Sequence, residues 1–182
     1  MTDLQPIWLL DIDGVINAAA EMAPRNVWPE SEWVGTEARD EHGRLFPLLA
    51  ARPVLEFIRA VHESDRAEIR WHTTWQEAAN NVADAFDLPH FPVQPAAEWP
   101  PTPDLEVWWK LPATRRVVAE GRPVIWTDDD TSFHVSRPAR AKLAGRTPML
   151  VISPNVRAGL SKRHLRRIES FLKQHSKVPA AV

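Results

Sequence analysis

Three apolar segments of the sequence lead into polar residues whose side chains can do chemistry. The run WLLDIDGVIN contains Asp11 and Asp13, two residues apart, with Gly14 directly after them. The segment AEIRWHT ends in Thr73, and PVIWT runs into three consecutive aspartates that begin at Asp128. Carboxylate oxygens are the ligands that a hard cation such as Mg²⁺ takes, and a bound cation offsets the repulsion between neighbouring carboxylates. The pattern therefore indicates a metal-assisted reaction.

The segments around these residues alternate between strand-like and helix-like patterns. Apolar runs predict strands over residues 7–10, 67–73, 90–93, 123–127 and 149–152. Helical spacing and capping residues predict helices that begin near residues 53, 74, 112 and 161. This alternation favours an α/β fold with a doubly wound, three-layer parallel sheet and right-handed crossovers. Ligands of such sheets bind beyond the carboxyl ends of the strands, so the polar groups are expected to meet in one crevice.

Two segments do not fit this alternation. Residues 18–52 are rich in Pro, Glu and Trp, and residues 89–103 contain six prolines. We interpret both as insertions that flank the crevice. A proline-rich stretch is also typical of an interdomain linker. Here, however, the polar strand ends that are expected to form one site lie on both sides of it. The sequence thus predicts a single domain over residues 1–175, with a flexible tail at 176–182.

Composition excludes several classes of protein and site. The chain has 182 residues, of which 44% are hydrophobic, which suits one globular domain. It has no cysteine, which removes disulfides, thiolate metal sites and cysteine nucleophiles together. No segment has the pattern of a signal peptide or a bilayer span, so we expect a cytoplasmic protein without a membrane partner.

Charge is distributed unevenly along the chain. Residues 1–130 hold 23 of the 24 acidic and 11 of the 22 basic groups, a net of −12, whereas residues 131–182 hold 11 basic groups and only Glu169, a net of +10. The last predicted helix carries four basic groups on one polar arc: Lys162, Arg163, Arg166 and Arg167. This arc is either a solvated face beside an acidic remainder or a surface that binds a polyanion such as RNA or DNA.

Four short motifs, taken in order, carry a resemblance to a known family. DIDGVIN resembles motif I of the haloacid dehalogenase-like (HAD) superfamily, and WHTT resembles motif II. Lys110 in WWKLPATRRV resembles motif III, and WTDDD resembles the acidic motif IV. The KLPATRR and WTDDD stretches are more narrowly similar to the HAD domain of Swiss-Army-knife RNA-repair proteins and its stand-alone relatives. The resemblance implies a HAD-like Rossmannoid sheet with small cap insertions and a phosphatase activity.

Phosphoryl transfer gives each carboxylate a role. It needs a nucleophile, neutralisation of the phosphoryl oxygens and a proton for the leaving oxygen. Asp11 is expected to attack phosphorus and form an aspartyl phosphate, with Asp13 as the general acid that the resemblance implies. The expected Mg²⁺ ligands are the Asp11 carboxylate, the Asp13 backbone carbonyl and the Asp128 carboxylate. Asp129 is either a further ligand or a partner of one.

The phosphoryl oxygens need their own donors. Thr73 and Lys110 are the expected ones, since Thr73 ends a strand beside a helix N-terminus. Thr74 is the rival, but as the first residue of the box Thr-Trp-Gln-Glu it is assigned to capping the helix. Without the order of motifs, the favoured interpretation of Lys110 is a solvated surface lysine. Gly14 allows the backbone to approach the ligand closely.

Other residues receive a structural interpretation by default. His72 and His134 flank the predicted site, yet an isolated histidine is more often structural. Stacking platforms for nucleic-acid bases are one interpretation of three tryptophans in the insertions: Trp28, Trp33 and Trp99. The sequence thus predicts a Mg²⁺-dependent phosphomonoesterase, with RNA or DNA ends and small metabolites both open as substrates. A non-catalytic nucleic-acid-binding module on a HAD scaffold is the alternative, and the oligomeric state is not predicted.

Overall fold

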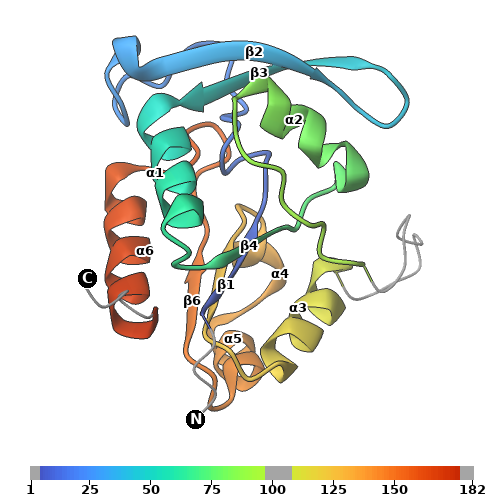
Figure 1. Ribbon diagram of the computed structural model, residues 1–182, viewed down its shortest axis with the longest axis vertical. Helices are drawn as coiled ribbons and strands as arrows, with labels where there is room; N and C mark the ends of the chain where they lie inside the picture. The colour runs from blue at the N-terminus through green and yellow to red at the C-terminus, as the bar shows by residue number, and fades with distance from the viewer. Residues whose placement is uncertain (1–4, 97–107, 177–182) are drawn as a thin grey trace.

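The core of the protein is a four-stranded parallel sheet with the strand order β4-β1-β5-β6. The computed structural model describes residues 5–96 and 108–176 (Figure 1). The strands are β1 (Ile7–Leu10), β4 (Glu68–Trp71), β5 (Val124–Thr127) and β6 (Met149–Ile152). Leu10 lies opposite both Trp71 and Thr127, so the three neighbouring strands end at the same level. Residues that follow these strands therefore meet at one edge of the sheet.

Helices cover both faces of the sheet, which makes three layers (Figure 1). One face carries α1 (Arg52–Glu63), α2 (Ala79–Ala85) and α6 (Lys162–His175). The other carries α3 (Lys110–Ala119), α4 (Thr131–His134) and α5 (Arg137–Ala144). Alternate residues of β1 divide between the two cores: Trp8 and Leu10 pack with the first set of helices, and Ile7 and Leu9 with the second. The expected α/β fold with a parallel sheet is confirmed.

All four residues of β1 are fully buried. A continuously apolar strand is stable only where both of its faces are covered, which explains why this segment lies in the middle of the sheet. The indole of Trp8 keeps a hydrogen bond there, since its Nε1 donates to Oγ1 of Thr127 at 3.0 Å. Truncating such a side chain to alanine costs about 3–5 kcal/mol.

The chain order reverses between β1 and β5. The chain that follows β1 goes on to α1 on one face of the sheet, and the chain that follows β5 enters α4 on the other. The Asp11 N–H donates to the carbonyl of Thr127 at 3.1 Å, so the two strand ends stay in contact where they diverge. Two neighbouring strands whose connections diverge leave a crevice beyond their carboxyl ends. The sequence predicted a site at this place.

The first insertion contains a β-hairpin. A 3₁₀ turn, η1 (Glu30–Glu32), leads into β2 (Trp33–Arg39), which pairs in antiparallel fashion with β3 (Leu45–Ala51). The hairpin lies across the carboxyl end of the sheet (Figure 1). At its tip Asp40 accepts hydrogen bonds from the backbone N–H groups of His42 and Arg44, and Gly43 has a φ of +76°. The sequence pattern of this segment predicted no strands.

Several local predictions need correction. Residues 90–93 do not form a strand, because only Val93 bridges to Trp71 at the edge of β4. The helix expected from residue 74 begins with a 3₁₀ turn, η2 (Gln76–Ala78). Gln76 has a φ of +47°, which no regular helix allows, so the first turn cannot be capped as predicted. Helix α3 begins at Lys110, and Pro112 lies within its first turn, where proline is tolerated.

The tryptophans of the first insertion belong to the fold. Trp28 is buried and donates from Nε1 to the carbonyl of Leu160 at 2.9 Å, and Nε1 of Trp33 donates to the carbonyl of Trp28. Trp28 is therefore not a free stacking platform, while Trp99 lies outside the described residues. So do residues 97–103 of the second insertion and 177–182 of the predicted tail. Among the described residues, no helix is both long and apolar enough to cross a bilayer.

Candidate metal and phosphate site

A buried lysine joins two buried carboxylates at the carboxyl edge of the sheet. Asp11 follows β1, Asp128 follows β5, and Lys110 is the first residue of α3. The Lys110 ammonium donates to Oδ2 of Asp11 and to Oδ2 of Asp128, both at 2.5 Å. Asp11 is 6% exposed, Lys110 4% and Asp128 0%. The interpretation of Lys110 as a solvated surface lysine is therefore wrong.

A third carboxylate completes this group. Single oxygens of Asp11, Asp128 and Asp129 all lie within 4.8 Å of one another, and we call these three residues the carboxylate cluster. Asp129 packs against the backbone of Gly14, which has a φ of +69°. A Cβ added to Gly14 would stand 2.4 Å from Cγ of Asp129. Glycine is needed at position 14 for two reasons: the positive φ and the space that the Asp129 side chain fills.

The cluster perturbs the protonation of its members. Burial and the neighbouring charge of Asp11 raise the pKa of Asp128 well above its ordinary range, although Lys110 opposes this. Burial, Asp11 and Asp130 raise the pKa of Asp129 to about 6. Burial alone would lower the pKa of Lys110, but the charges of Asp11 and Asp128 outweigh it and raise that pKa. Lys110 is therefore protonated. Its single positive charge is shared among the neighbouring carboxylates.

The cluster fits a divalent cation. Three carboxylates and one ammonium leave a formal charge of −2 at a largely buried point. All donors of the cluster are oxygens, which is the donor set that Mg²⁺ requires. Burial and, after it, the charge of Asp11 raise the pKa values of both Asp128 and Asp129, so negative charge is incompletely compensated at this point. Asp11, Asp128 and Asp129 are the residues that would hold the ion.

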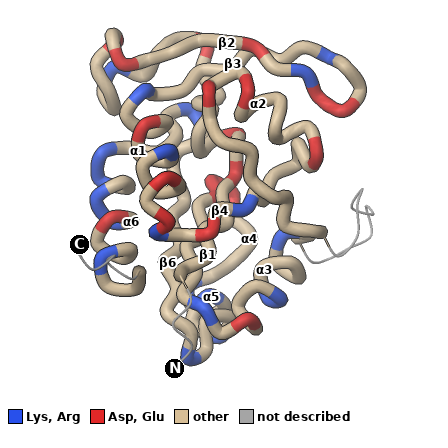
Figure 2. The backbone as a smooth tube through the Cα atoms, viewed as in Figure 1, with Lys and Arg blue, Asp and Glu red and all other residues tan. Residues whose placement is uncertain are grey.

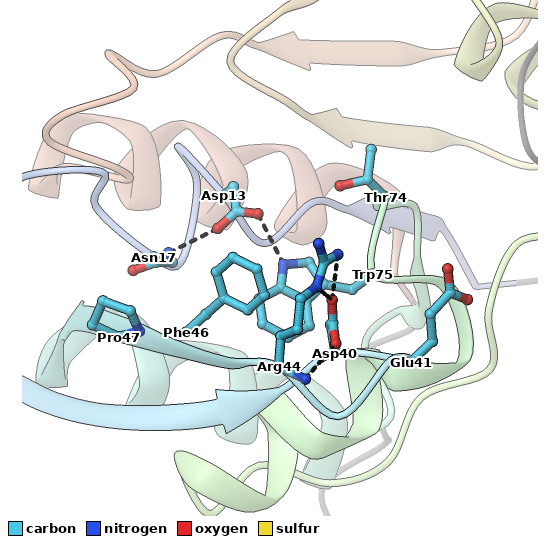
Figure 3. Close-up of a pocket in the computed structure, with 9 residues that line it drawn as sticks. All are labelled: Asp13, Asn17, Asp40, Glu41, Arg44, Phe46, Pro47, Thr74 and Trp75. Carbon is cyan, nitrogen blue, oxygen red and sulfur yellow. Dashed lines mark hydrogen bonds and ion pairs between the residues drawn. The ribbon is translucent and has the colours of Figure 1, made fainter.

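Asp13 occupies a different position from the cluster. Its Oδ1 accepts from Nδ2 of Asn17 at 2.7 Å, and its Oδ2 accepts from Nε1 of Trp75 at 2.8 Å (Figure 3). Asn17 in turn accepts from the N–H of Leu49 on β3 at 2.8 Å. The Asp13 carboxylate is therefore oriented by two donors, one of which is fixed to the hairpin. The predicted Mg²⁺ contact of Asp13 concerned its backbone carbonyl and stays a prediction.

A cavity of about 310 Å³ opens beside Asp13 and Trp75. We call it the hairpin pocket, because the tip of the hairpin supplies its opposite wall with Arg44 and Phe46 (Figure 3). Thr74 also lines it. Residues 18–52 were expected to flank the crevice, but none of the hairpin residues that line this pocket was expected there. The signal available was the turn sequence DEHG between two apolar segments, which is typical of a hairpin.

The two threonines after β4 differ in exposure. Thr73 is fully buried, and its Oγ1 accepts weakly from the Trp75 N–H at 3.4 Å. Thr74 is exposed and does not cap a helix, because η2 begins only at Gln76 and has no side-chain cap. The Gln76 side chain instead donates to the carbonyl of Thr73 at 2.6 Å. The reason for assigning Thr74 to the backbone is therefore wrong, and both threonines remain candidates for binding phosphate.

The histidines near the site pack against aromatic rings. His72 is 1% exposed, and its ring is stacked 5.7 Å from that of Trp109. Burial and the charge of Lys110 lower the pKa of His72 well below its ordinary value, so the imidazole is neutral. His134 stacks on Trp108 at 4.6 Å. These contacts favour the structural interpretation of both histidines.

The basic arc of α6 lies outside the carboxylate cluster. Its four residues are exposed and form no ion pair with a described residue: Lys162, Arg163, Arg166 and Arg167. Lys and Arg are concentrated along this helix (Figure 2). The loop before α6 contacts the segment after the first aspartates, since Leu160 N–H donates to the carbonyl of Val15 at 2.9 Å. The helix therefore begins beside the loops that border the crevice.

Compared with protein-family models and with curated proteins, the sequence matches none.

Proposed function

We propose that the protein is a Mg²⁺-dependent phosphomonoesterase in which Asp11 is the nucleophile. The observation that carries this proposal is the carboxylate cluster around a buried lysine. A structural ion pair needs one lysine and one carboxylate. Three carboxylates, one ammonium and an adjacent open pocket are instead the set of groups that phosphoryl transfer requires.

In the proposed reaction an Asp11 oxygen forms a bond to phosphorus while the bond from phosphorus to the leaving oxygen breaks. The leaving oxygen takes a proton from Asp13, and the product on the protein is an aspartyl phosphate. Asp13 then accepts a proton from water, which attacks phosphorus and releases inorganic phosphate and the Asp11 carboxylate. A bound Mg²⁺ ion would supply positive charge against the phosphoryl oxygens.

The surroundings of Asp11 and Asp13 suit these two roles. Lys110 already binds Asp11, so the ammonium is in place for a phosphoryl group that approaches this carboxylate. Asp13 faces the hairpin pocket, where the leaving group would lie, and accepts hydrogen bonds from Asn17 and Trp75. These two donors hold the Asp13 carboxyl group in place beside the pocket. Asp11 would thus act on the phosphoryl group and Asp13 on the leaving group.

An assay with ethyl phosphate tests the proposal. We expect release of inorganic phosphate that requires Mg²⁺, stops with EDTA and falls at least about 10³-fold in Asp11→Asn, because an amide cannot attack phosphorus. Glu37→Gln, on the exposed part of β2, is the control for replacing a hairpin carboxylate outside both the cluster and the hairpin pocket. Equal activity of Asp11→Asn and wild type would refute the assignment of Asp11 as the nucleophile.

The physiological substrate stays a separate proposal. The exposed cations of α6, which form no ion pair with a described residue and lie beside the loops of the crevice, favour a phosphate at the end of a polyanion such as RNA or DNA. The same cations are the observation that favours the second candidate function, a nucleic-acid-binding module without catalysis. Turnover of ethyl phosphate distinguishes the two, since a binding module has none.

A further inference from the structure

Phe46 occupies an unusual place on the hairpin. It is two residues from Leu48 on β3, so both side chains leave the same face of the strand. Leu48 is 3% exposed in the core, whereas Phe46 on the same face is 40% exposed. The difference arises because the hairpin pocket lies beneath Phe46 and the core lies beneath Leu48. An aromatic ring is thus directed inward over a cavity.

Phe46 is held in this place by its neighbours. Its ring meets the indole of Trp75 edge to face, with 5.7 Å between the centroids, and Trp75 is bonded to Asp13. The Arg44 guanidinium lies 5.7 Å from the centroid of the Phe46 ring. Two rings and a planar guanidinium therefore surround the space next to the proposed proton donor (Figure 3). Such groups favour a flat partner, because planar rings stack on one another and on guanidinium groups.

The charges of the pocket oppose an anionic partner. Arg44 is the one cation among the described residues that line it, and its Nη2 already pairs with Oδ2 of Asp40 at 2.7 Å. Glu41 and Asp13 add two further carboxylates. A second phosphate or a carboxylate inside the pocket would meet a net negative wall, so the remaining phosphates of a polyanionic substrate would have to lie outside it. The volume of about 310 Å³ is at the small end of ligand pockets, which limits the occupant to about one ring system.

We propose that the hairpin pocket binds the leaving group of the phosphomonoester and that Phe46 selects a planar, uncharged one. Suitable groups are an arylmethyl alcohol or a nucleoside, rather than an aliphatic ring or an anionic sugar. This inference rests on the proposed function for the position of the phosphate, and it adds the class of substrate. Phe46 is a specificity-determining residue, not a catalytic one.

A matched pair of substrates tests the proposal by turnover. Benzyl phosphate and cyclohexylmethyl phosphate have leaving alcohols of similar size and acidity, but only the first is planar. We expect wild type to prefer benzyl phosphate in kcat/KM, and Phe46→Leu to reduce that preference about three- to tenfold. Leu45→Ala is the control, because Leu45 is the neighbouring exposed residue of β3 and does not line the pocket. Its preference should equal that of wild type.

A binding experiment separates this inference from the proposed function. The phosphonates that replace the ester oxygen by CH₂, 2-phenylethylphosphonate and 2-cyclohexylethylphosphonate, are titrated calorimetrically with Mg²⁺ present. We expect tighter binding of the phenyl compound to wild type and a three- to tenfold smaller preference in Phe46→Leu. If neither phosphate ester is hydrolysed but this binding preference holds, the proposed function fails and the pocket assignment stands. Absent binding, equal binding of the two compounds, or a preference unchanged in Phe46→Leu overturns the inference.

Discussion

The crevice and the outer face of α6 both concentrate charge, but they bury it to opposite extents. In the crevice Asp11, Lys110 and Asp128 are nearly inaccessible and in direct contact. The basic residues of α6 are exposed and form no ion pair with a described residue. Burial of charge costs free energy that only well-placed partners offset, whereas exposed charge costs little. The crevice therefore supports a functional inference from geometry alone, and the helix requires a binding experiment.

The largest effect on stability should come from removing the central cation of the crevice. Lys110→Met leaves buried carboxylates without their partner and should lower the free energy of unfolding by about 3–5 kcal/mol in metal-free buffer. Lys173→Met is the matched control on α6, where the side chain is 72% exposed and lies 3.6 Å from Glu169. It should change stability by no more than about 1 kcal/mol. Urea denaturation measures both, and similar losses in the two variants would remove the contrast between the regions.

The next effect concerns the metal and separates two members of the cluster. Asp128 is fully buried and bonded to Lys110, whereas Asp129 is half-buried and packs on Gly14. We expect Asp128→Ala to raise the Mg²⁺ concentration for half-maximal activity more than about 100-fold, and Asp129→Ala about tenfold. The shift of melting temperature on adding Mg²⁺ should shrink in the same order. The reverse order in both measurements would show that Asp129 is the principal ligand.

A smaller effect should appear in the pH dependence of stability. The pKa of Asp129 is raised from 3.8 to about 6 by burial, Asp11 and Asp130, so the folded state binds its proton more tightly than the unfolded state. Wild type should therefore lose stability relative to Asp129→Asn as the pH rises from about 4 to about 6 in metal-free buffer. Adding Mg²⁺ at pH 7 should reverse this difference in stability, so that wild type becomes more stable than Asp129→Asn. A difference that stays constant over this range would mean that Asp129 titrates normally.

The smallest effect on the fold should come from α6. Replacing its four basic residues by Gln should change stability by only about 0.5 kcal/mol per site and leave the rate on benzyl phosphate unaltered. Affinity for an oligonucleotide with a terminal phosphate should fall. The slope of log affinity against log salt should become shallower by about 0.7–0.9 for each lost contact. An unchanged slope would identify the basic arc as a solvated face.

The sequence predicted the position of the crevice because local patterns determine it. Ile7 to Leu10 and Val124 to Thr127 are apolar runs that only a covered parallel sheet accommodates. Since parallel strands end at one edge, Asp11 and Asp128 had to come close to each other. The presence of Lys110 beside them followed from the order of motifs and not from its spacing. Its burial was visible only in the structure.

The surroundings of Asp13 could not be predicted, because they depend on contacts between distant segments. Trp75 lies 62 residues from Asp13, and nothing in its local sequence indicates a hydrogen bond to that carboxylate. The predicted capping box failed for a local reason, because Gln76 has a φ of +47° and its side chain donates to the Thr73 carbonyl three residues before it. Propensities describe what a segment prefers by itself. They do not include a partner that folding brings from elsewhere in the chain.

The antiparallel pairing of the hairpin makes it an exchangeable unit. Trp33 at its start lies opposite Ala51 at its end, so the segment leaves the domain and rejoins it at one point. Its tip, by contrast, extends to the pocket with Arg44 and Phe46. Residues of the tip can therefore be replaced, lengthened or randomised while the strands at the base keep their register. Combinatorial libraries confined to residues 40–46 are thus a direct route to altered substrate preference on an unchanged scaffold.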